Sequence, residues 1–450
     1  MFKKFMARIF GRYAKTRHKN AAVLDARKYG LRRDQISNGS LRTVETLQQR
    51  GYRAFIVGGA VRDLLIGEKP KDYDVATDAM PEEVRQCFRR SRVIGRRFQI
   101  VHVLMGSETV EVTTFRGRHP GGAKGLTDNH GRLLRDNVFG NHKEDAERRD
   151  FTINALYFDP VAETIVDYHN GVADLKEKRL RVIGDPETRY REDPVRMLRA
   201  VRLAAKLGFV IDPKAQKPLR GLAPLIENVP SARLVDETLK LLMSGHAVES
   251  LERLRAEGLH GGLLPLLDIV LDNPRSERFV RQALQGTDRR VRERKPVSSG
   301  FLFAALLWHD VLDQWETLRD SGELPMPSLF LSMDSALARQ GEKLAITRRI
   351  AGDIREIWSL QPRFEQRAGK RPYGLLEHPR FRAAYDFLLL RVESGEAPAE
   401  LGQWWTEFLD AGASERAAML LPAETRGTRR RRRRRAAPSA PLESADSTTI

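Results

Sequence analysis

The feature that most constrains the fold of this chain is a change of residue pattern near residue 184. Before this point, short apolar runs of strand length are separated by glycines and polar residues, whereas after it apolar residues recur at helical spacing. The sequence therefore predicts a strand-containing N-terminal part followed by a helical part. The expected elements before the change are a helix at Leu41–Arg50 and strands at Tyr52–Val57, Asp72–Ala76, Val101–Met105 and Val110–Phe115, the last two joined by a hairpin turn at Gly106-Ser107-Glu108.

Composition limits the partners and the location of the chain. With 450 residues, 41% of them hydrophobic, the chain is long enough for about two to four packed units. Its net charge of +18 suits a polyanionic partner such as RNA, DNA or an anionic membrane. Cys87 is the only cysteine, which excludes an intramolecular disulfide and zinc sites built from paired cysteines. We expect a cytoplasmic protein, because one cysteine fits a reducing compartment and no apolar run approaches the roughly 20 residues of a membrane span.

Three segments differ in composition from the rest of the chain. Residues 1–20 contain no Asp or Glu, and apolar residues recur among their Lys and Arg at helical spacing. Such a segment can lie on a membrane surface, but we favour a frayed leader or a helix docked on the body. Residues 117–141, rich in Gly, His, Asn and Asp, predict a mobile loop. From about residue 422, seven consecutive arginines followed by Ala, Pro and Ser predict disorder.

Two short motifs in the N-terminal part predict a site for phosphates and metal ions. Gly58-Gly59 follows an apolar strand and opens a helix, where the backbone and free N–H groups can bind an anion, although such a pair is often only a turn. In Asp72-Tyr73-Asp74, residues i and i+2 of a strand share a face, so both carboxylates point the same way while Tyr73 points into the core. Two close carboxylates repel each other without a cation, so this pair predicts a two-Mg²⁺ site; the alternative is two solvated aspartates on an edge strand.

Three further charged residues are candidates for the same site. Glu111, on a neighbouring strand, can complete the acidic cluster or be an exposed strand residue. Arg149 can contact a triphosphate. Asp150, at the start of the apolar segment that follows, can be an active-site acid or the N-cap of a helix. The residues alone leave these alternatives open.

The helical part opens on a charged segment that can select a nucleotide. Pro194 suits the first position of a helix, which makes Asp193 a natural N-cap. Arg196 and Arg199 share a helix face, and Arg202 roughly continues it. An Asp and an Arg together can offer an acceptor and donors to the edge of a base. The alternative is a capped amphipathic helix with a solvated basic face.

Five segments, in this order, resemble the class II nucleotidyltransferases of the bacterial poly(A) polymerase and tRNA CCA-adding family. They are FIVGGAVRDLLIG, KDYDVAT, EVTTFRG, RRDFTINALYF and YREDPVRMLRAVRLAAKLGF, between residues 55 and 209, with a looser likeness over about residues 36–260. The resemblance implies an α+β fold, with a small mixed β-sheet nucleotidyltransferase head followed by an all-α neck, body and tail and a disordered basic C-terminus. The expected divisions are a basic leader at 1–35, the head at 36–183, a neck with nucleotide- and RNA-binding residues at 184–260, a body and C-terminal RNA-binding domain at 261–421, and an Arg-rich tail at 422–450.

The resemblance also implies roles for the candidate residues. Asp72 and Asp74 are expected to hold two Mg²⁺ ions, one activating an RNA 3′-hydroxyl and the other holding the triphosphate of ATP, with Asp150 as a further active-site acid. Glu111 is a further catalytic candidate on the strength of its strand position alone. The expected nucleotide-binding residues are Gly58, Gly59, Arg62, Asp63, Arg149, Asn154, Asp193, Arg196, Arg199 and Arg202. The expected RNA-binding residues of the tail are Arg429, Arg430, Arg431, Arg432, Arg433, Arg434 and Arg435. The implied partners are the 3′ ends of mRNA and small RNA, with RNA-degradation and RNA-chaperone proteins as further candidates.

Three features favour the poly(A) polymerase branch over the CCA-adding branch. They are the segment GRRFQIVHVLMGSETVEVTTFRG, the segment LLEHPRFRAAYDFLLLR at 375–391 with the following Trp404-Trp405, and the Arg-rich tail. This branch predicts addition of AMP from ATP to RNA 3′ ends without a template, promoting RNA turnover. CCA addition to tRNA would need CTP as well, and a non-catalytic RNA-binding protein would be expected to have lost the acidic pair, which is present. Trp308-His309-Asp310 resembles part of a metal phosphohydrolase site, but further ligands are missing nearby, so we expect a helix-end detail there.

Overall fold

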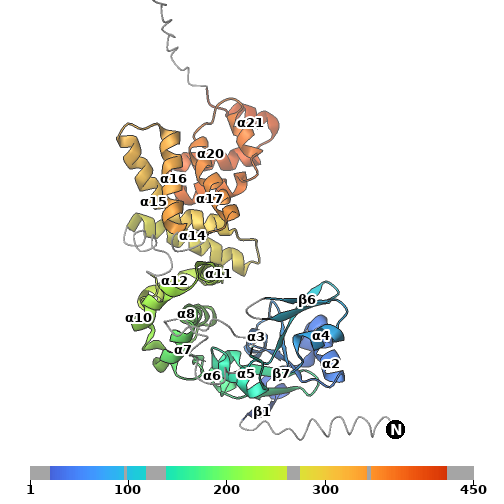
Figure 1. Cartoon of the computed structure of the whole chain (residues 1–450). Helices are drawn as coiled ribbons and strands as arrows, with labels where there is room; N and C mark the ends of the chain where they lie inside the picture. Colours follow the sequence, from blue (N-terminus) through green and yellow to red (C-terminus); the bar gives the residue numbers. More distant parts are fainter. Residues whose placement is uncertain (1–20, 96–98, 118–137, 261–273, 342–345, 423–450) are drawn as a thin grey trace, which may run out of the picture.

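The protein has a sheet-containing head at one end and a column of helices that leads from it to the C-terminal end (Figure 1). The structure is a computed structural model that describes residues 21–95, 99–117, 138–260, 274–341 and 346–422. Most strands lie in the first part of the chain, and the region after the head is helical apart from one two-residue strand. This arrangement confirms the predicted α+β fold class.

The head is built on one mixed sheet of eight strands. Its strands are β1 Ala22–Asp25, β2 Ala54–Val57, β3 Asp74–Thr77, β4 Ser91–Ile94, β5 Ile100–Met105, β6 Glu108–Thr114, β7 Leu156–Asp159 and β8 Thr164–Asp167. Their spatial order is β1-β8-β7-β2-β3-β6-β5-β4, and β3 and β6 are parallel while the other neighbouring pairs are antiparallel. A separate parallel pair, β9 Arg179–Leu180 and β10 Val210–Ile211, connects the end of the head to the first neck helices.

The two faces of the large sheet are covered differently. One face carries buried valines of β3, β5 and β6, which pack against helices α2 Asn38–Gln49 and α4 Pro81–Cys87. On the other face, helix α5 His142–Arg148 packs over β2 and β7, where the His142 ring stacks on Phe55 and Phe115 at centroid distances of 4.5 and 4.9 Å. Alternation along the strands separates the two sets of side chains, because neighbouring residues point to opposite faces. The candidate site lies on the same face as α5, beside it.

The expected strands of the head are present with small shifts of their ends. The predicted hairpin has a two-residue turn at Gly106-Ser107, with Gly106 at φ 66°, and Glu108 already belongs to β6. Asp72 precedes β3, which begins at Asp74, so the acidic pair sits at the entry of the strand rather than within it. The ends of the predicted loop meet through the Gly117 N–H and the Val138 carbonyl at 2.8 Å, and the interior of that loop, 118–137, lies outside the described residues.

The helical part contains two successive groups of helices. The apolar core of the head continues into most of them, whereas the last helices form a second apolar cluster around Phe364 and Trp405. The other helices of head and neck are α3 Gly59–Leu65, α6 Gly171–Lys176, α7 Pro186–Glu192, α8 Val195–Leu207, α9 Pro213–Gln216, α10 Leu219–Leu222, α11 Ser231–Leu242 and α12 Ala247–Ala256. The remaining helices are α14 Pro274–Arg292, α15 Ser299–Asp320, α16 Pro325–Gly341, α17 Arg348–Leu360, α18 Arg371–Leu376, α19 Phe381–Glu393, α20 Ala399–Asp410 and α21 Ala413–Met419. Short 3-10 turns occur at η1 Ala26–Tyr29, η2 Arg33–Gln35, η3 Thr152–Asn154, η4 Ala223–Asn228 and η5 Gln361–Arg363.

The expectation of a helix-end detail at Trp308-His309-Asp310 is wrong. His309 lies in the middle of α15, where its side chain is buried and its Nε2 is 2.7 Å from Glu396 Oε1. Trp308 Nε1 donates to the other oxygen of Glu396 at 2.9 Å, and Asp310 pairs with Arg339. The motif is therefore part of a buried polar link between α15 and the end of α19.

Candidate active site

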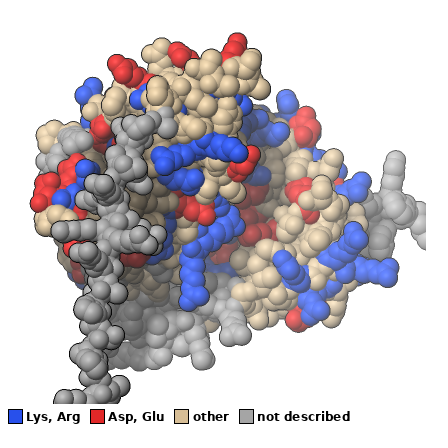
Figure 2. Space-filling view, turned by 90° about the horizontal axis from the view of Figure 1, so that it is seen from above, with Lys and Arg blue, Asp and Glu red and all other residues tan. Residues whose placement is uncertain are grey.

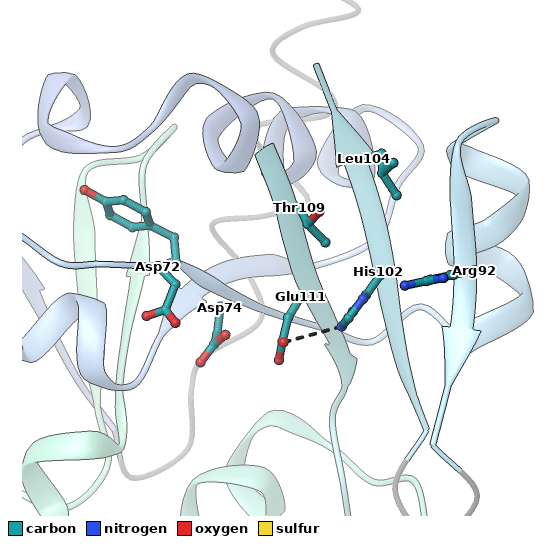
Figure 3. Close-up of a pocket in the computed structure, with 8 residues that line it drawn as sticks. Asp72, Asp74, Arg92, His102, Leu104, Thr109 and Glu111 are labelled. Atoms are coloured by element: carbon teal, nitrogen blue, oxygen red, sulfur yellow. Dashed lines mark ion pairs between the residues drawn. The ribbon is translucent and has the colours of Figure 1, made fainter. Parts of the chain in front are cut away.

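An open pocket of about 620 Å³ lies on the face of the head sheet beside α5 (Figure 3). Its lining residues are Asp72, Tyr73, Asp74, Arg92, His102, Leu104, Thr109 and Glu111. The carboxylates of Asp72 and Asp74 lie on the same side of the chain, as their spacing predicts, and Glu111 lies next to Asp74 on β6 (Figure 3). Val75 is fully buried on the opposite face, whereas Tyr73 is only partly buried and donates its hydroxyl to the Gln35 carbonyl at 2.7 Å.

Electrostatics make the acidic end of this pocket favourable for a cation. Burial, then the negative charges of Glu111 and Asp72, raise the pKa of Asp74 to about 6, and Arg149 opposes this rise only in part. Among the described residues, no group of three His, Cys, Asp or Glu side chains forms a complete protein metal site. Mg²⁺ commonly takes one or two carboxylates and completes its octahedron with water and substrate phosphates. The Asp72–Asp74 pair therefore fits Mg²⁺ that is shared with a phosphate-bearing substrate.

Glu111 has a partner within the pocket. Its Oε1 is 3.4 Å from His102 Nε2 on the neighbouring strand β5, and its side chain is about half exposed. The strand register places Glu111 directly opposite Asp74 on one side and His102 on the other. Glu111 thus belongs to the acidic cluster in space, and its catalytic role stays a prediction.

Arg149 is fixed beside the glycine turn by two buried neighbours. It donates to Asp145 Oδ2 at 3.0 and 3.2 Å and to the Tyr157 hydroxyl at 2.9 Å. Burial disfavours its charge, but Tyr157 and Asp145 outweigh this and raise the pKa of Arg149 above its ordinary value. Its Nη1 would lie 3.6 Å from a Cβ on Gly58, whose φ of 79° favours glycine. Arg149 therefore stays charged next to the start of α3, where a triphosphate is expected.

The other predicted nucleotide-binding residues around α3 are bonded to one another. Arg62 is buried, donates to Asn154 Oδ1 at 2.7 Å and pairs with Asp63 at 2.5 Å. Asp63 is also 3.7 Å from Lys206 Nζ on α8. These side chains join α3 to the 3-10 turn η3 and to the neck. Arg62 also packs against the glycine turn, since its Nη2 would lie 3.4 Å from a Cβ on Gly59.

Asp150 joins the head to the neck. Its Oδ1 accepts from the Phe151 N–H at 2.8 Å and from Asn154 Nδ2 at 3.3 Å, while its Oδ2 is 2.7 Å from Arg199 Nη2 on α8. Burial acts to raise the pKa of Asp150, but Arg199 and these hydrogen bonds hold it below its ordinary value. The helical-cap alternative is wrong, because η3 has Phe151 at its N-cap position and no side-chain cap.

The predicted N-cap role of Asp193 is also wrong. Helix α8 begins at Val195 after Pro194, with no side-chain cap, and Asp193 instead receives two hydrogen bonds of 3.0 Å from Arg233 on α11. A bidentate guanidinium satisfies both carboxylate oxygens, which outcompetes a single bond to the helix backbone. Arg233, not a helix terminus, thus orients Asp193.

The arginines of α8 are distributed over different partners. Arg196 donates to the Arg189 carbonyl at 2.7 Å and to Glu192 at 3.1 Å. Arg202 is 3.5 Å from Glu237 on α11, and Arg199 reaches into the head to Asp150. Of these three arginines, only Arg199 is therefore seen to pair with a residue of the head.

Sequence reasoning missed the residues that hold the site arginines and Asp193. Asp145 lies four residues before Arg149, a helical spacing that could have indicated the pair. Tyr157 and Arg233 belong to other elements than their partners, so no helical spacing relates them to Arg149 and Asp193. His102 could have been found, because counting outward from the two-residue turn at Gly106-Ser107 pairs it with Glu111. The leader 1–20 and the tail arginines, Arg429 to Arg435, lie outside the described residues.

Comparison with protein-family models finds three matches along the chain. "Poly A polymerase head domain" matches residues 54–181, "Probable RNA and SrmB- binding site of polymerase A" matches 208–271, and "Polymerase A arginine-rich C-terminus" matches 321–437. The chain is 44% identical over 408 residues to poly(A) polymerase I of Salmonella typhimurium, which covers 88% of each protein. The chain belongs to the poly(A) polymerase family. Within this family, the pocket of the head occupies the part matched by the head-domain model.

Related proteins of the CCA-adding type share less of the chain. The CCA-adding enzyme of Lactobacillus helveticus is 39% identical over 209 residues, which is 46% of this chain and 51% of that enzyme. Among solved structures, "Crystal structure of Bacillus stearothermophilus CCA-adding enzyme in complex with CTP" matches 83% of this chain and 82% of that one, with 25% identity and a TM-score of 0.57. This chain and that CCA-adding enzyme thus share the same overall fold.

Proposed function

We propose that this protein is a poly(A) polymerase, which adds AMP from ATP to RNA 3′ ends without a template. The observation that carries the proposal is the 44% identity to a poly(A) polymerase I over 88% of both chains. Retention of Asp72 and Asp74 on one side of the pocket supports catalysis rather than RNA binding alone. We further propose that the RNAs are mRNA and small RNA, that their turnover is promoted, and that the protein acts in the cytoplasm.

In the proposed reaction, the RNA 3′-oxygen attacks the α-phosphorus of ATP in line and pyrophosphate leaves. Mg²⁺ bound at Asp72 and Asp74 would supply Lewis-acid stabilisation of the charge on the attacking and leaving oxygens. The side chains of the protein contribute by holding the substrate in position. Arg149, held by Asp145 and Tyr157, presents a fixed positive charge beside the turn at Gly58. Such preorganised charge is an effective way to stabilise a phosphoryl-type transition state.

Selection of adenine is proposed to lie in the neck. Asp193 is fixed by Arg233 in a bidentate pair, and Arg196 is fixed by the Arg189 carbonyl and Glu192. A rigid acceptor and a rigid donor favour one base edge over another, since a mismatched base would leave a buried polar group unpaired. The Asp150–Arg199 ion pair connects this neck to the head.

CCA addition to tRNA is the second candidate function. It is favoured by the shared architecture with a CCA-adding enzyme solved in complex with CTP. The two functions differ in the nucleotide used and in the length of the product. The same assay therefore separates them.

The test is to incubate the purified protein with Mg²⁺ and either a generic RNA with a 3′-hydroxyl or a tRNA lacking its CCA end. Each RNA receives ATP, CTP or both, and the products are sized on a gel. We expect a long ladder on the generic RNA with ATP alone. Addition of three nucleotides to the tRNA only, with a requirement for CTP, would establish the CCA-adding function. No product in any lane with a folded protein would favour the non-catalytic RNA-binding alternative.

The surface charge and the helix composition of the protein bear on the partners and membranes that it can contact. Figure 2 shows Lys and Arg side chains on several parts of one face, with Asp and Glu between them. Among the helices that the structure describes, none combines the length and the apolar character that crossing a bilayer requires. RNA-degradation and RNA-chaperone proteins are proposed partners.

A further inference from the structure

Four polar side chains form a row across the open face of the head sheet. Strand register pairs Asp74 with Glu111, Glu111 with His102, and His102 with Arg92. The row therefore crosses the neighbouring strands β3, β6, β5 and β4, and all four residues line the pocket. Because neighbouring strands lie about 4.8 Å apart, the backbones at the two ends of the row are about 14 Å apart.

The row has opposite charges at its two ends. Asp72, Asp74 and Glu111 make one end acidic, and this end needs a cation before it can accept a phosphate. Arg92 at the other end is exposed and points into the pocket from β4 (Figure 3). Within the described part of the chain, no carboxylate lies within 4 Å of it to form an ion pair. The basic end can therefore bind a phosphate without a metal ion.

The geometry of in-line transfer decides which phosphate belongs there. The attacking oxygen and the leaving pyrophosphate must lie on opposite sides of the α-phosphorus. The glycine turn and Arg149 lie beside β2 and α5, on one side of the carboxylates. The β5–β4 edge lies on the other side. If the triphosphate occupies the Arg149 side, the RNA end has to approach over β6, β5 and β4.

The side chains next to the row suit the sugar and base of a terminal nucleotide. Leu104 on β5 is paired with Thr109 on β6, both line the pocket, and 43% of Leu104 is exposed. An exposed apolar side chain beside a hydroxyl can contact a ribose or the flat face of any base. Neither side chain has the paired donors and acceptors that read a particular base edge. This surface is therefore suited to an RNA end of any sequence.

We propose that the β4–β6 face is the subsite for the 3′-terminal nucleotide of the RNA, with Arg92 binding the phosphodiester on the 5′ side of that nucleotide. Leu104 and Thr109 contact the nucleotide itself, so that its 3′-hydroxyl reaches the acidic end of the row. This assignment rests on the proposed polymerase function, since it names where that reaction takes its second substrate. In this assignment, Arg92 binds the RNA substrate and does not contact ATP.

The test compares Arg92→Ala with Arg42→Ala in the full-length protein. Arg42 is an exposed arginine on α2, which covers the opposite face of the sheet, so it is a matched control for loss of one positive charge. We expect Arg92→Ala to raise the KM for a short RNA about tenfold, which corresponds to about 1.4 kcal/mol, and to change the KM for ATP less than twofold. Arg42→Ala should change neither. An equal rise in both KM values, or an unchanged KM for RNA, would overturn the assignment.

A modified RNA locates the contact on one phosphate. The second substrate is an RNA with a neutral methylphosphonate at its last internucleotide linkage. For the wild-type protein, this replacement should raise the KM for RNA about tenfold. For Arg92→Ala, whose KM is already raised, the replacement should cause no further rise. The same replacement several linkages upstream should affect both proteins equally. Equal losses in both proteins with the terminal methylphosphonate would place the phosphate contact elsewhere. A wild-type protein that extends no RNA would instead contradict the polymerase function, which keeps the two failures distinct.

Discussion

At the scale of single residues, Asp72 and Asp74 are expected to be essential for chemistry and unfavourable for stability. Burial, and then neighbouring negative charges, raise the pKa of Asp74 to about 6, so the native state without metal resists its ionisation. Asp72→Asn and Asp74→Asn should abolish AMP incorporation, because an amide is a poor ligand for Mg²⁺. Asp74→Asn should leave the free energy of unfolding without metal unchanged or raise it slightly. Gel assays and urea unfolding measure the two effects.

The matched control for these variants is Asp34→Asn, which removes one carboxylate from an exposed surface pair with Arg32. Such pairs contribute little, so activity and stability should stay close to those of the wild type. Wild-type activity in either active-site variant would rule out the metal assignment. Loss of the folded state in Asp74→Asn would mean that its carboxylate has a structural role that the contacts do not indicate.

The Asp150–Arg199 pair gives a second residue-scale prediction. Asp150 is buried, and burial acts to raise its pKa. The charge of Arg199 is the main cause that lowers this pKa, so the two charges depend on each other. In a double-mutant cycle with Asp150→Asn and Arg199→Gln, we expect a coupling of about 1–2 kcal/mol in unfolding free energy, given that Arg199 is partly exposed. Urea denaturation of the four proteins gives this value. Additive effects would show that the pair does not act as a unit in joining head to neck.

At the scale of elements, the sequence predicts the parts of the head whose pattern is local. The apolar strand before Gly58, the hairpin at Gly106-Ser107 and the apolar stripe of α8 each depend on neighbouring residues, and each is present. The pattern does not single out β1, β4, β7 or β8, which have four residues each. β1 owes its place to pairing with β8, which lies more than 130 residues further along the chain. The error at Asp193 has the same origin. Its partner Arg233 is 40 residues away, and only the packing of α8 against α11 brings them together.

The buried link between α15 and the end of α19 gives an element-scale prediction for pH. The side chain of Glu396 is fully buried, and although burial acts to raise its pKa, hydrogen bonds from His309 and Trp308 hold the pKa below its ordinary value. Ionised Glu396 therefore stabilises the fold above pH about 4.5, and this contribution is lost as the pH falls through the lower native pKa. Glu396→Gln should reduce the free energy of unfolding by about 1–3 kcal/mol at pH 7.

The difference between wild type and Glu396→Gln should shrink as the pH falls below about 4.5. Urea unfolding at pH 7, 5 and 4 measures it. Glu400→Gln, at an exposed glutamate on α20, is the control and should match the wild type throughout. A difference that grows towards acid pH would have the wrong sign for an ionised Glu396.

At the scale of the whole molecule, the sequence predicts the division into a head and a helical part, because composition and periodicity change along the chain. It does not predict how the two parts are joined. That junction depends on the ion pairs Asp63–Lys206 and Asp150–Arg199. The members of these pairs are 143 and 49 residues apart and belong to different sequence motifs. Residues expected to contact the substrate thus also hold the head against α8. Activity and head–neck stability are therefore expected to be coupled at these positions.

The basic tail supplies the last prediction. Replacing Arg426 and Arg429–Arg435 by serine lowers the formal net charge by eight, from +18 to +10. If these arginines bind RNA phosphates, the variant should bind RNA more weakly and the slope of log K against log salt should flatten by up to about 6, since each neutralised single-strand phosphate contributes about 0.7. Addition of one nucleotide at saturating RNA should be preserved, because no active-site group is removed. Replacing the same residues by lysine keeps the charge and should keep the slope. An unchanged slope in the serine variant would mean that the tail arginines do not contact phosphate, and RNA binding would then depend on the folded part, which remains basic.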